Sequence, residues 1–332
     1  MKTIHKILLI SLLFIPFFSC KKNKIEQVEP YKPTPVSIKY PSNFPEMKIP
    51  SDNLPTKEAI ALGRALYYEK MLSKNQNRSC SSCHDQSKAF TTPTANPLAH
   101  INLGWSEQFL WNGKYKTLED VMLYEVEDFF ETDLAVINAS EKYKSMFKKA
   151  YNVEQISYKN LAYALAQFFR TMNSYNSKYD KWLRGETTFT NDELEGYYIF
   201  FSERGDCFHC HGTLLTHDNS MHNNGLDINP DPGMFEATGK PSDYGKFKSP
   251  TLRNIELTAP YMHDGRFQTL AEVLMFYSNG VQKDSPNLSP LMKYASNGGV
   301  QLDAQEMQYL IAFLKTLTDN DFITNPDLSD PN

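Results

Sequence analysis

Several features that would point to other classes of protein are missing from this sequence of 332 residues. It has five cysteines, four in two short motifs and one at Cys20, so no disulfide framework is left over. Positive charge is not in excess, and the net charge of -5 gives no sign of a nucleic-acid partner. The apolar run over residues 7–18 is too short to span a membrane, which takes about 20 residues. The length still allows two domains of ordinary size.

The first 20 residues have the build of a secretory signal. Lys2 and Lys6 precede the apolar run, which ends in Phe17-Phe18-Ser19-Cys20. This ending resembles a lipobox, where cleavage before Cys20 leaves a thiol for lipidation, with plain secretion as the alternative. Residues 21–50 are rich in proline and polar residues, and we interpret them as a flexible tether. We expect a protein on the periplasmic side of a bacterial membrane, held there only by a lipid on Cys20.

Two stretches share the pattern C-x-x-C-H: Cys80-Ser81-Ser82-Cys83-His84 and Cys207-Phe208-His209-Cys210-His211. This pattern is the attachment signature of a c-type haem, whose vinyl groups add to the two thiols. The histidine at the end, His84 or His211, is then placed to bind the iron. A thioredoxin-like redox pair and a zinc site are alternatives, but neither motif lies in a βαβ pattern and a zinc site would have to join two distant motifs. The sequence therefore predicts two covalently bound haem c groups.

Helical spacing recurs along the chain outside these motifs. Helix starts are indicated at Thr56, Thr117, Thr190 and Asp303. Apolar residues recur at helical spacing over 161–172, and we interpret them as core. The predicted organisation is a haem domain over residues 51–188, a second over 189–320 and a frayed polar tail over 321–332.

An internal repeat extends beyond the two motifs. Residues 112–118 (NGKYKTL) align with residues 264–270 (DGRFQTL), and each is followed by an acid and a valine. Trp111 and His263 take corresponding places before the two segments. The chain therefore consists of two related halves, each with a haem motif followed by a turn and a capped helix.

The helix after Thr269 offers two candidate ligands for the second haem. Tyr277 shares one helical face with apolar residues, whereas Met275 lies about 200° away around the axis. Both cannot face one haem, and the apolar face favours Tyr277. A tyrosine that only fills the core is the alternative.

Two residues near the first motif are also candidates. His100 lies in a proline-containing loop, where a surface histidine and a ligand on the far side of the iron are equally acceptable interpretations. Glu131 follows Phe129 and Phe130, and a carboxyl group among aromatic rings is protonated more readily than usual. Spacing alone favours a solvated surface acid at this position.

Over about residues 50 to 318 the chain resembles the bacterial di-haem cytochrome c peroxidases and their MauG-type relatives. The resemblance rests on the paired C-x-x-C-H motifs together with Pro250-Thr251-Leu252-Arg253-Asn254 and Pro260-Tyr261-Met262-His263-Asp264-Gly265. It implies a mainly α fold of two cytochrome c-like haem domains packed face to face. The implied activity is a cytochrome-c peroxidase, which reduces hydrogen peroxide to water with electrons from a small donor such as a cytochrome c or a cupredoxin.

The resemblance also implies roles for single residues. Trp111 matches an electron relay between the haems, and Glu131 matches the distal acid–base glutamate. His100 matches the histidine that caps the iron of the first, peroxidatic haem. At the second, electron-transfer haem, Tyr277 matches the tyrosine of the MauG-type branch, where peroxidases use methionine. His263 would lie beside that haem.

The chain departs from the family in ways that leave alternatives open. Thr258 and Pro260 match positions of a calcium site, but the interval over residues 101–110 is short and lacks an Arg-Asn element that helps to hold the ion. A glutamine common in the distal pocket is Val121 here. A MauG-type oxidase that modifies protein side chains and a non-catalytic di-haem electron carrier are the alternative functions. Homodimer formation is left open.

Overall fold

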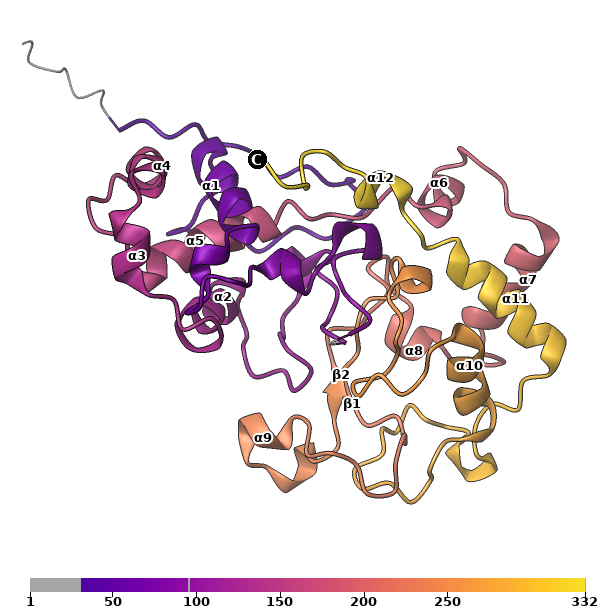
Figure 1. Ribbon diagram of the computed structural model, residues 1–332. Coiled ribbons are helices and arrows are strands. Elements are labelled where there is room, and N and C mark those ends of the chain that lie inside the picture. Colours follow the sequence, from indigo (N-terminus) through magenta and orange to yellow (C-terminus); the bar gives the residue numbers. More distant parts are fainter. Residues whose placement is uncertain (1–30, 95, 332) are drawn as a thin grey trace, which may run out of the picture. The chain divides into compact units, whose positions relative to one another are not determined.

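The computed structural model describes residues 31–94 and 96–331, and from Lys32 onward they form one compact unit (Figure 1). The predicted leader over residues 1–20, including Cys20, lies outside the described residues. None of the described helices has the length and apolar character needed to cross a membrane. The unit is mostly helical, and its sheet consists of two short antiparallel strands. The elements are α1 (Lys57–Tyr67), α2 (Leu118–Tyr124), α3 (Leu134–Ala139), α4 (Glu141–Tyr151), α5 (Tyr158–Phe169), α6 (Lys178–Leu183), α7 (Asn191–Phe200), α8 (Phe208–His211), β1 (Met221–His222), α9 (Phe235–Thr238), β2 (Phe247–Lys248), α10 (Leu270–Asn279), α11 (Ala304–Lys315) and α12 (Asn320–Ile323).

The helices begin where their sequence signals predict. Thr56 caps α1 and Thr117 caps α2, each by accepting a hydrogen bond from a backbone N–H of the first turn. Thr190 and Asp303 form reciprocal capping boxes at the starts of α7 and α11. These contacts satisfy amide groups that a helix start leaves without partners.

Two hydrophobic clusters form the cores of the two halves. The first is built mainly from α1, α2, α4 and α5, and the second mainly from α6, α7, α10 and α11; in Figure 1 these two groups of helices lie at opposite ends of the described unit. In each half two helices cross closely, α1 with α5 and α7 with α11. A Cβ atom on Gly63 would lie 2.0 Å from the carbonyl oxygen of Ala164, and one on Gly196 would lie 1.9 Å from that of Tyr309. Both crossings therefore depend on a glycine.

The internal repeat appears as two copies of one turn. The Phe109 N–H donates to the Tyr115 carbonyl at 2.9 Å, and the Tyr261 N–H donates to the Phe267 carbonyl at 2.7 Å. Gly113 and Gly265 occupy the same place in the two turns, with φ of +65° and +70°. The aligned sequences thus adopt the same backbone conformation, and each turn leads into a helix capped by threonine.

A second pair of equivalent residues was not recognised in the sequence. Asn102 and Asn254 are fully buried, both have positive φ, and each precedes a short 3₁₀ turn. The Asn102 side chain accepts from the Ser174 N–H, and the Asn254 side chain accepts from the Asp319 N–H, both at 2.8 Å. Each half therefore ties its post-motif loop to the segment that follows a core helix, α5 in the first half and α11 in the second.

Three parts of the predicted organisation need correction. Residues 34–49, assigned to a flexible tether, pack against the unit because Phe44 and Met47 are buried beside Trp105 and Leu215. The segment 178–188, assigned to the first domain, begins with α6, whose Tyr179 packs in the second cluster.

The tail over residues 321–332 is not frayed in its described part. Phe322 and Leu328 are buried in the first cluster, and the Tyr68 hydroxyl donates to the Leu328 carbonyl at 2.6 Å. The Asp319 carboxylate accepts hydrogen bonds from the Ser174 hydroxyl and from the backbone N–H groups of Tyr175 and Asn176. Two apolar anchors in a polar segment are enough to fix it, and the tail of the second half therefore packs on the first.

Candidate haem site

The first motif forms a single helical turn that brings its reactive groups together. The His84 N–H donates to the Cys80 carbonyl at 3.0 Å, and the Cys83 N–H donates to the same oxygen at 3.1 Å. Nδ1 of His84 lies 2.8 Å from the Phe90 carbonyl oxygen, which makes Nδ1 the protonated nitrogen and leaves Nε2 free. Burial lowers the pKa of His84 to about 4, so the ring is neutral. A neutral imidazole with a fixed tautomer is what a metal ligand requires.

The second motif repeats this arrangement on α8. The His211 N–H donates to the Cys207 carbonyl at 3.1 Å, and Nδ1 of His211 lies 2.9 Å from the Thr216 carbonyl oxygen. Burial lowers the pKa of His211 below its ordinary value. Both motif histidines therefore present an unprotonated Nε2, and both motifs fit the proximal side of a haem.

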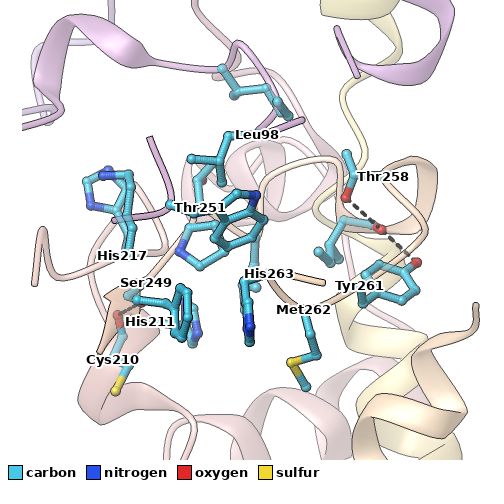
Figure 2. A pocket seen from close by; sticks show the side chains of 18 of the residues that line it. Leu98, Cys210, His211, His217, Ser249, Thr251, Thr258, Tyr261, Met262 and His263 are labelled. Carbon is cyan, nitrogen blue, oxygen red and sulfur yellow. Dashed lines mark hydrogen bonds between the residues drawn. The ribbon is translucent and has the colours of Figure 1, made fainter. Parts of the chain in front are cut away.

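Both motifs open onto one cavity of about 630 Å³. This volume is within the usual range for cofactor pockets. Figure 2 shows how Cys210, His211, His217, Met262 and His263 surround one region of it. The predicted site residues on its wall are Cys80, Cys83, His84, His100, Trp111, Cys207, Cys210, His211, Thr258, Pro260, His263 and Tyr277.

A buried lysine on the cavity wall supports the fit of an acidic cofactor. Lys248 is 7% exposed, and its Nζ has no hydrogen-bond partner in the described part of the chain. Burial lowers the pKa of Lys248 to about 8. A buried ammonium group without an acceptor is costly, and the carboxylates of a haem would supply one. The two neutral histidines and this lone ammonium together fit haem. No spacing pattern in the sequence marked Lys248.

His100 lies directly against the first motif histidine. The His84 and His100 rings stack with centroids 3.4 Å apart and planes 16° apart, and Nδ1 of His100 lies 3.2 Å from the Tyr67 hydroxyl. Burial and the neighbouring His84 hold the pKa of His100 well below its ordinary value. Rings stacked face to face cannot bind opposite faces of one porphyrin. His100 would therefore have to move away from His84 to act as the far ligand, and that role stays a prediction.

The two glutamates of this half are placed differently. Glu131 is not among the residues that line the cavity: its side chain is 58% exposed and its Oε2 lies 2.5 Å from Nζ of Lys74. Glu125, which the sequence offered only as one of a run of acids, lines the cavity. Burial raises the pKa of Glu125 to about 7.

Trp111 lies where the two halves meet. Its indole N–H donates to the Asn96 carbonyl at 3.3 Å, and its own carbonyl accepts from the Lys248 N–H at 2.9 Å. The Asn96 side chain in turn donates to the carbonyl oxygens of Met262 and His263, at 2.9 and 3.1 Å. Trp111 thus contacts backbone from both halves, which is the position that an electron relay would need.

The second motif faces Tyr277. The Tyr277 hydroxyl accepts a hydrogen bond from the Asn224 side chain at 3.0 Å, and burial raises the pKa of Tyr277 to about 12. Met275 is 53% exposed and lies outside the cavity lining, as its position on the other helical face predicts. The sequence analysis missed Met262 and Met292, which also line the cavity and carry sulfur atoms of the type that binds haem iron.

Two further histidines on the cavity wall were also missed. His217 is buried, and burial lowers its pKa to about 3. Nε2 of His222 lies 2.6 Å from Asp218, and this hydrogen bond raises the pKa of His222 to about 10. Both follow the second motif in a loop whose composition gave no periodic signal.

The candidate calcium residues lie together beside a loop of the second half. Figure 2 shows Thr258 and Tyr261 near one another, and both hydroxyl groups donate to the Ile255 carbonyl, at 3.3 and 2.9 Å. In the described residues, neither cluster of three potential metal-binding His, Cys, Asp or Glu side chains includes Thr258 or Pro260. Calcium at this place stays a prediction.

Comparisons with known proteins agree with this arrangement. A family model described as di-haem cytochrome c peroxidase matches residues 57–188. The chain is 29% identical to cytochrome c551 peroxidase of Nitrosomonas europaea, over 83% of this chain and 85% of that protein. It is 30% identical to the methylamine utilization protein MauG of Methylorubrum extorquens, over 81% of this chain and 80% of that protein.

Among solved structures, a MauG-like protein associated with microbial copper homeostasis has 35% sequence identity and a TM-score of 0.81, covering 89% of this chain and 99% of that one. The likeness thus extends over most of the chain. The chain belongs to the family of di-haem cytochrome c peroxidases and MauG proteins.

Proposed function

We propose that this protein reduces hydrogen peroxide to water with electrons from a small redox protein, a cytochrome c or a cupredoxin. The observation that carries the proposal is the pair of neutral motif histidines, each with a free Nε2, that open onto one cavity lined from both halves. Cys80 and Cys83 would hold one haem by thioether bonds, and Cys207 and Cys210 would hold the other.

Each bound haem supplies redox-active iron, and the chain supplies ligation, orientation and proton handling. His84 and His211 would bind the two haem irons, and Lys248 would neutralise a haem carboxylate. Trp111 lies between the two halves and links them for electron transfer. The first half would bind peroxide once His100 has moved, and a carboxyl group on its wall would move the proton. The two halves would act as a peroxidatic domain and an electron-transfer domain.

A second function is favoured by Tyr277 on the wall near the second motif. A MauG-type oxidase, acting on the side chains of another protein, would use the same cofactors. The two functions differ in the electron source: steady turnover with a reduced cytochrome or cupredoxin supports the peroxidase, and oxidation of a protein substrate without such a donor supports the oxidase.

Optical and EPR spectra of protein matured with haem, before and after peroxide, test the proposal. We expect two covalently retained haems per chain and a change at one of them when peroxide is added to the half-reduced protein. Two six-coordinate haems that do not respond to peroxide would instead indicate an electron carrier. Fewer than two covalent haems would overturn the assignment of the motifs.

Replacement of Tyr277 by methionine tests the ligand of the second haem. An anionic phenolate favours ferric iron, so Tyr277→Met should raise the reduction potential of that haem. Potentiometric titration followed in the optical spectrum measures this shift. The exposed Met275→Leu is the matched control, and its potential should equal that of the unmodified protein. An unchanged potential in Tyr277→Met would exclude Tyr277 as a ligand.

The location is proposed as the periplasmic side of a bacterial membrane, with a lipid on Cys20 as the anchor. This assignment follows from the leader and from the attachment of c-type haem after export.

A further inference from the structure

Three side chains of the kind that bind metal ions lie together beside the second motif. Glu203 and Asp206 precede the motif, and His209 stands between its two cysteines. A short turn, in which Asp206 has a φ of +58°, joins the end of α7 to α8 and brings them to one place. Nε2 of His209 lies 3.1 Å from Oδ1 of Asp206 and 3.4 Å from Oε1 of Glu203. The nitrogen and the two carboxylate oxygens all lie within 4.8 Å of one another.

The Asp206 carboxylate is buried and lacks a partner for one of its oxygens. Its side chain is 9% exposed, and Oδ1 has no hydrogen-bond partner among the described residues. Burial raises the pKa of Asp206 above its ordinary value, because a charge in this place is poorly compensated. A carboxylate oxygen buried in this way is costly unless a hydrogen-bond donor or a cation meets it.

The neighbouring Lys293 does not supply what Asp206 lacks. Nζ of Lys293 lies 2.8 Å from Nε2 of His209 and 2.9 Å from Oε2 of Glu203, and Glu203 raises the pKa of Lys293, so the group is an ammonium. An ammonium group only donates, so Nε2 accepts and has no proton for Asp206. If Nε2 carried a proton for Asp206 instead, the ammonium would face a second donor. One of the two short contacts at Nε2 is therefore always unsatisfied.

A zinc ion in place of this ammonium group would satisfy all three side chains. Zinc binds histidine nitrogen at about 2.0–2.1 Å and carboxylate oxygen at about 2.0–2.2 Å, usually with four ligands in a tetrahedron. Neighbouring ligand atoms of such a tetrahedron are about 3.3–3.6 Å apart. The distances of 3.1 and 3.4 Å from Nε2 of His209 are close to these values. Calcium and magnesium fit less well, because they take oxygen ligands.

We propose that Glu203, Asp206 and His209 form a zinc-binding site beside the second motif. This inference goes beyond the proposed function. When zinc binds, Lys293 leaves the three side chains and turns to solvent, where 41% of its side chain is already exposed. Asp206 also lines the cavity, and His209 lies between the cysteines that would hold the second haem. The site therefore places a double positive charge at the edge of that cavity, where it favours ferrous iron.

The first test is zinc binding by the haem-loaded protein, in which thioether-bound cysteines cannot take the metal. Isothermal titration calorimetry with Zn²⁺ should show one site per chain, and Ca²⁺ should not compete for it. His209→Ala and Asp206→Asn should each weaken binding at least about tenfold, because even groups that only orient a ligand contribute roughly 10–100-fold. Lys293→Met should bind zinc about fivefold more tightly, the value of an exposed ion pair. The exposed acid Glu195 of α7 provides the control, Glu195→Gln, which should match the unmodified protein.

The second test is the reduction potential of the second haem, followed in the optical spectrum. Zn²⁺ should raise this potential in the unmodified protein and leave it unchanged in Asp206→Asn, with haem content per chain equal in both. Zinc binding or a zinc-induced shift that is the same in Asp206→Asn and Glu195→Gln would overturn the site. Weaker binding in Lys293→Met would overturn it too, and that variant keeps all three ligands. Zinc bound through Asp206 in a protein that does not turn over peroxide would refute the proposed function and support the zinc site.

Discussion

Replacement of His84 by alanine is expected to abolish peroxide reduction while the second haem keeps its spectrum. His84 directly follows the first C-x-x-C pair, and the hydrogen bond from its Nδ1 to the Phe90 carbonyl leaves Nε2 free on the cavity wall. Loss of a group that merely orients a metal ligand costs roughly 10–100-fold. Loss of the ligand itself should therefore cost more than about 100-fold. Steady-state assays with a reduced donor measure the loss of peroxide reduction. Stopped-flow spectra with peroxide show whether the second haem keeps its spectrum.

The matched variant is His211→Ala, which makes the same change in the other half. It should lose steady turnover, because electrons no longer pass through the second haem, but should still react once with peroxide. Cys80 and Cys83 remain in His84→Ala, so haem content per chain distinguishes lost ligation from lost attachment. The opposite pattern, with single-turnover reaction lost only in His211→Ala, would assign the chemistry to the second half.

The candidate attachment residues could be picked out in the sequence because haem attachment needs a fixed local spacing, and the attachment itself stays a prediction. A thiol, two residues, a thiol and a histidine fit one helical turn, and both copies form that turn. Tyr277 could also be preferred over Met275, since helical geometry places them on different faces. Each of these predictions uses contacts within a few residues along the chain.

Lys248 and Glu125 could not be predicted, because their importance depends on what surrounds them. Lys248 is an ordinary lysine in sequence, and only its burial beside Trp111 leaves its ammonium group without an acceptor. Glu125 is one of several acids in a row, and the π-helical turn Glu125–Phe129 alone decides which of them faces the cavity. A helical wheel with 3.6 residues per turn fails at such a turn.

The features of the fold also divide into those that local sequence predicts and those that depend on distant parts of the chain. Helix starts and the repeat were predicted from capping residues and aligned segments. Residues 34–49 and the described part of the tail pack against the unit, unlike the prediction, because composition describes an average, whereas a few apolar anchors such as Phe44 and Phe322 decide whether a polar segment packs. Their partners lie far along the chain and leave no local pattern.

The largest effect on stability is expected from Arg253→Met. Arg253 is fully buried, and its guanidinium donates two hydrogen bonds of 2.8 Å to Asp180 in α6. It also donates to the Leu214 carbonyl, in the loop behind the second motif. Burial raises the pKa of Asp180, but the guanidinium outweighs this and holds it below its ordinary value. The residue therefore joins the second haem loop to the core of its half.

Methionine fills a similar volume but removes the ionic partner of Asp180, whose buried charge then keeps only the hydrogen bonds from Ser177. Breaking a buried pair in this way costs about 3–5 kcal/mol, a large part of the roughly 5–15 kcal/mol that stabilises a typical domain. Guanidinium unfolding of the haem-loaded protein, followed by circular dichroism, measures the loss. The exposed pair of Arg266 with Asp227 is the control, and Arg266→Met should cost less than about 1 kcal/mol. Arg253→Met combined with Asp180→Leu should recover much of the stability, because no charge then stays buried alone. A loss in Arg253→Met no larger than that in Arg266→Met would show that this pair does not hold the loop.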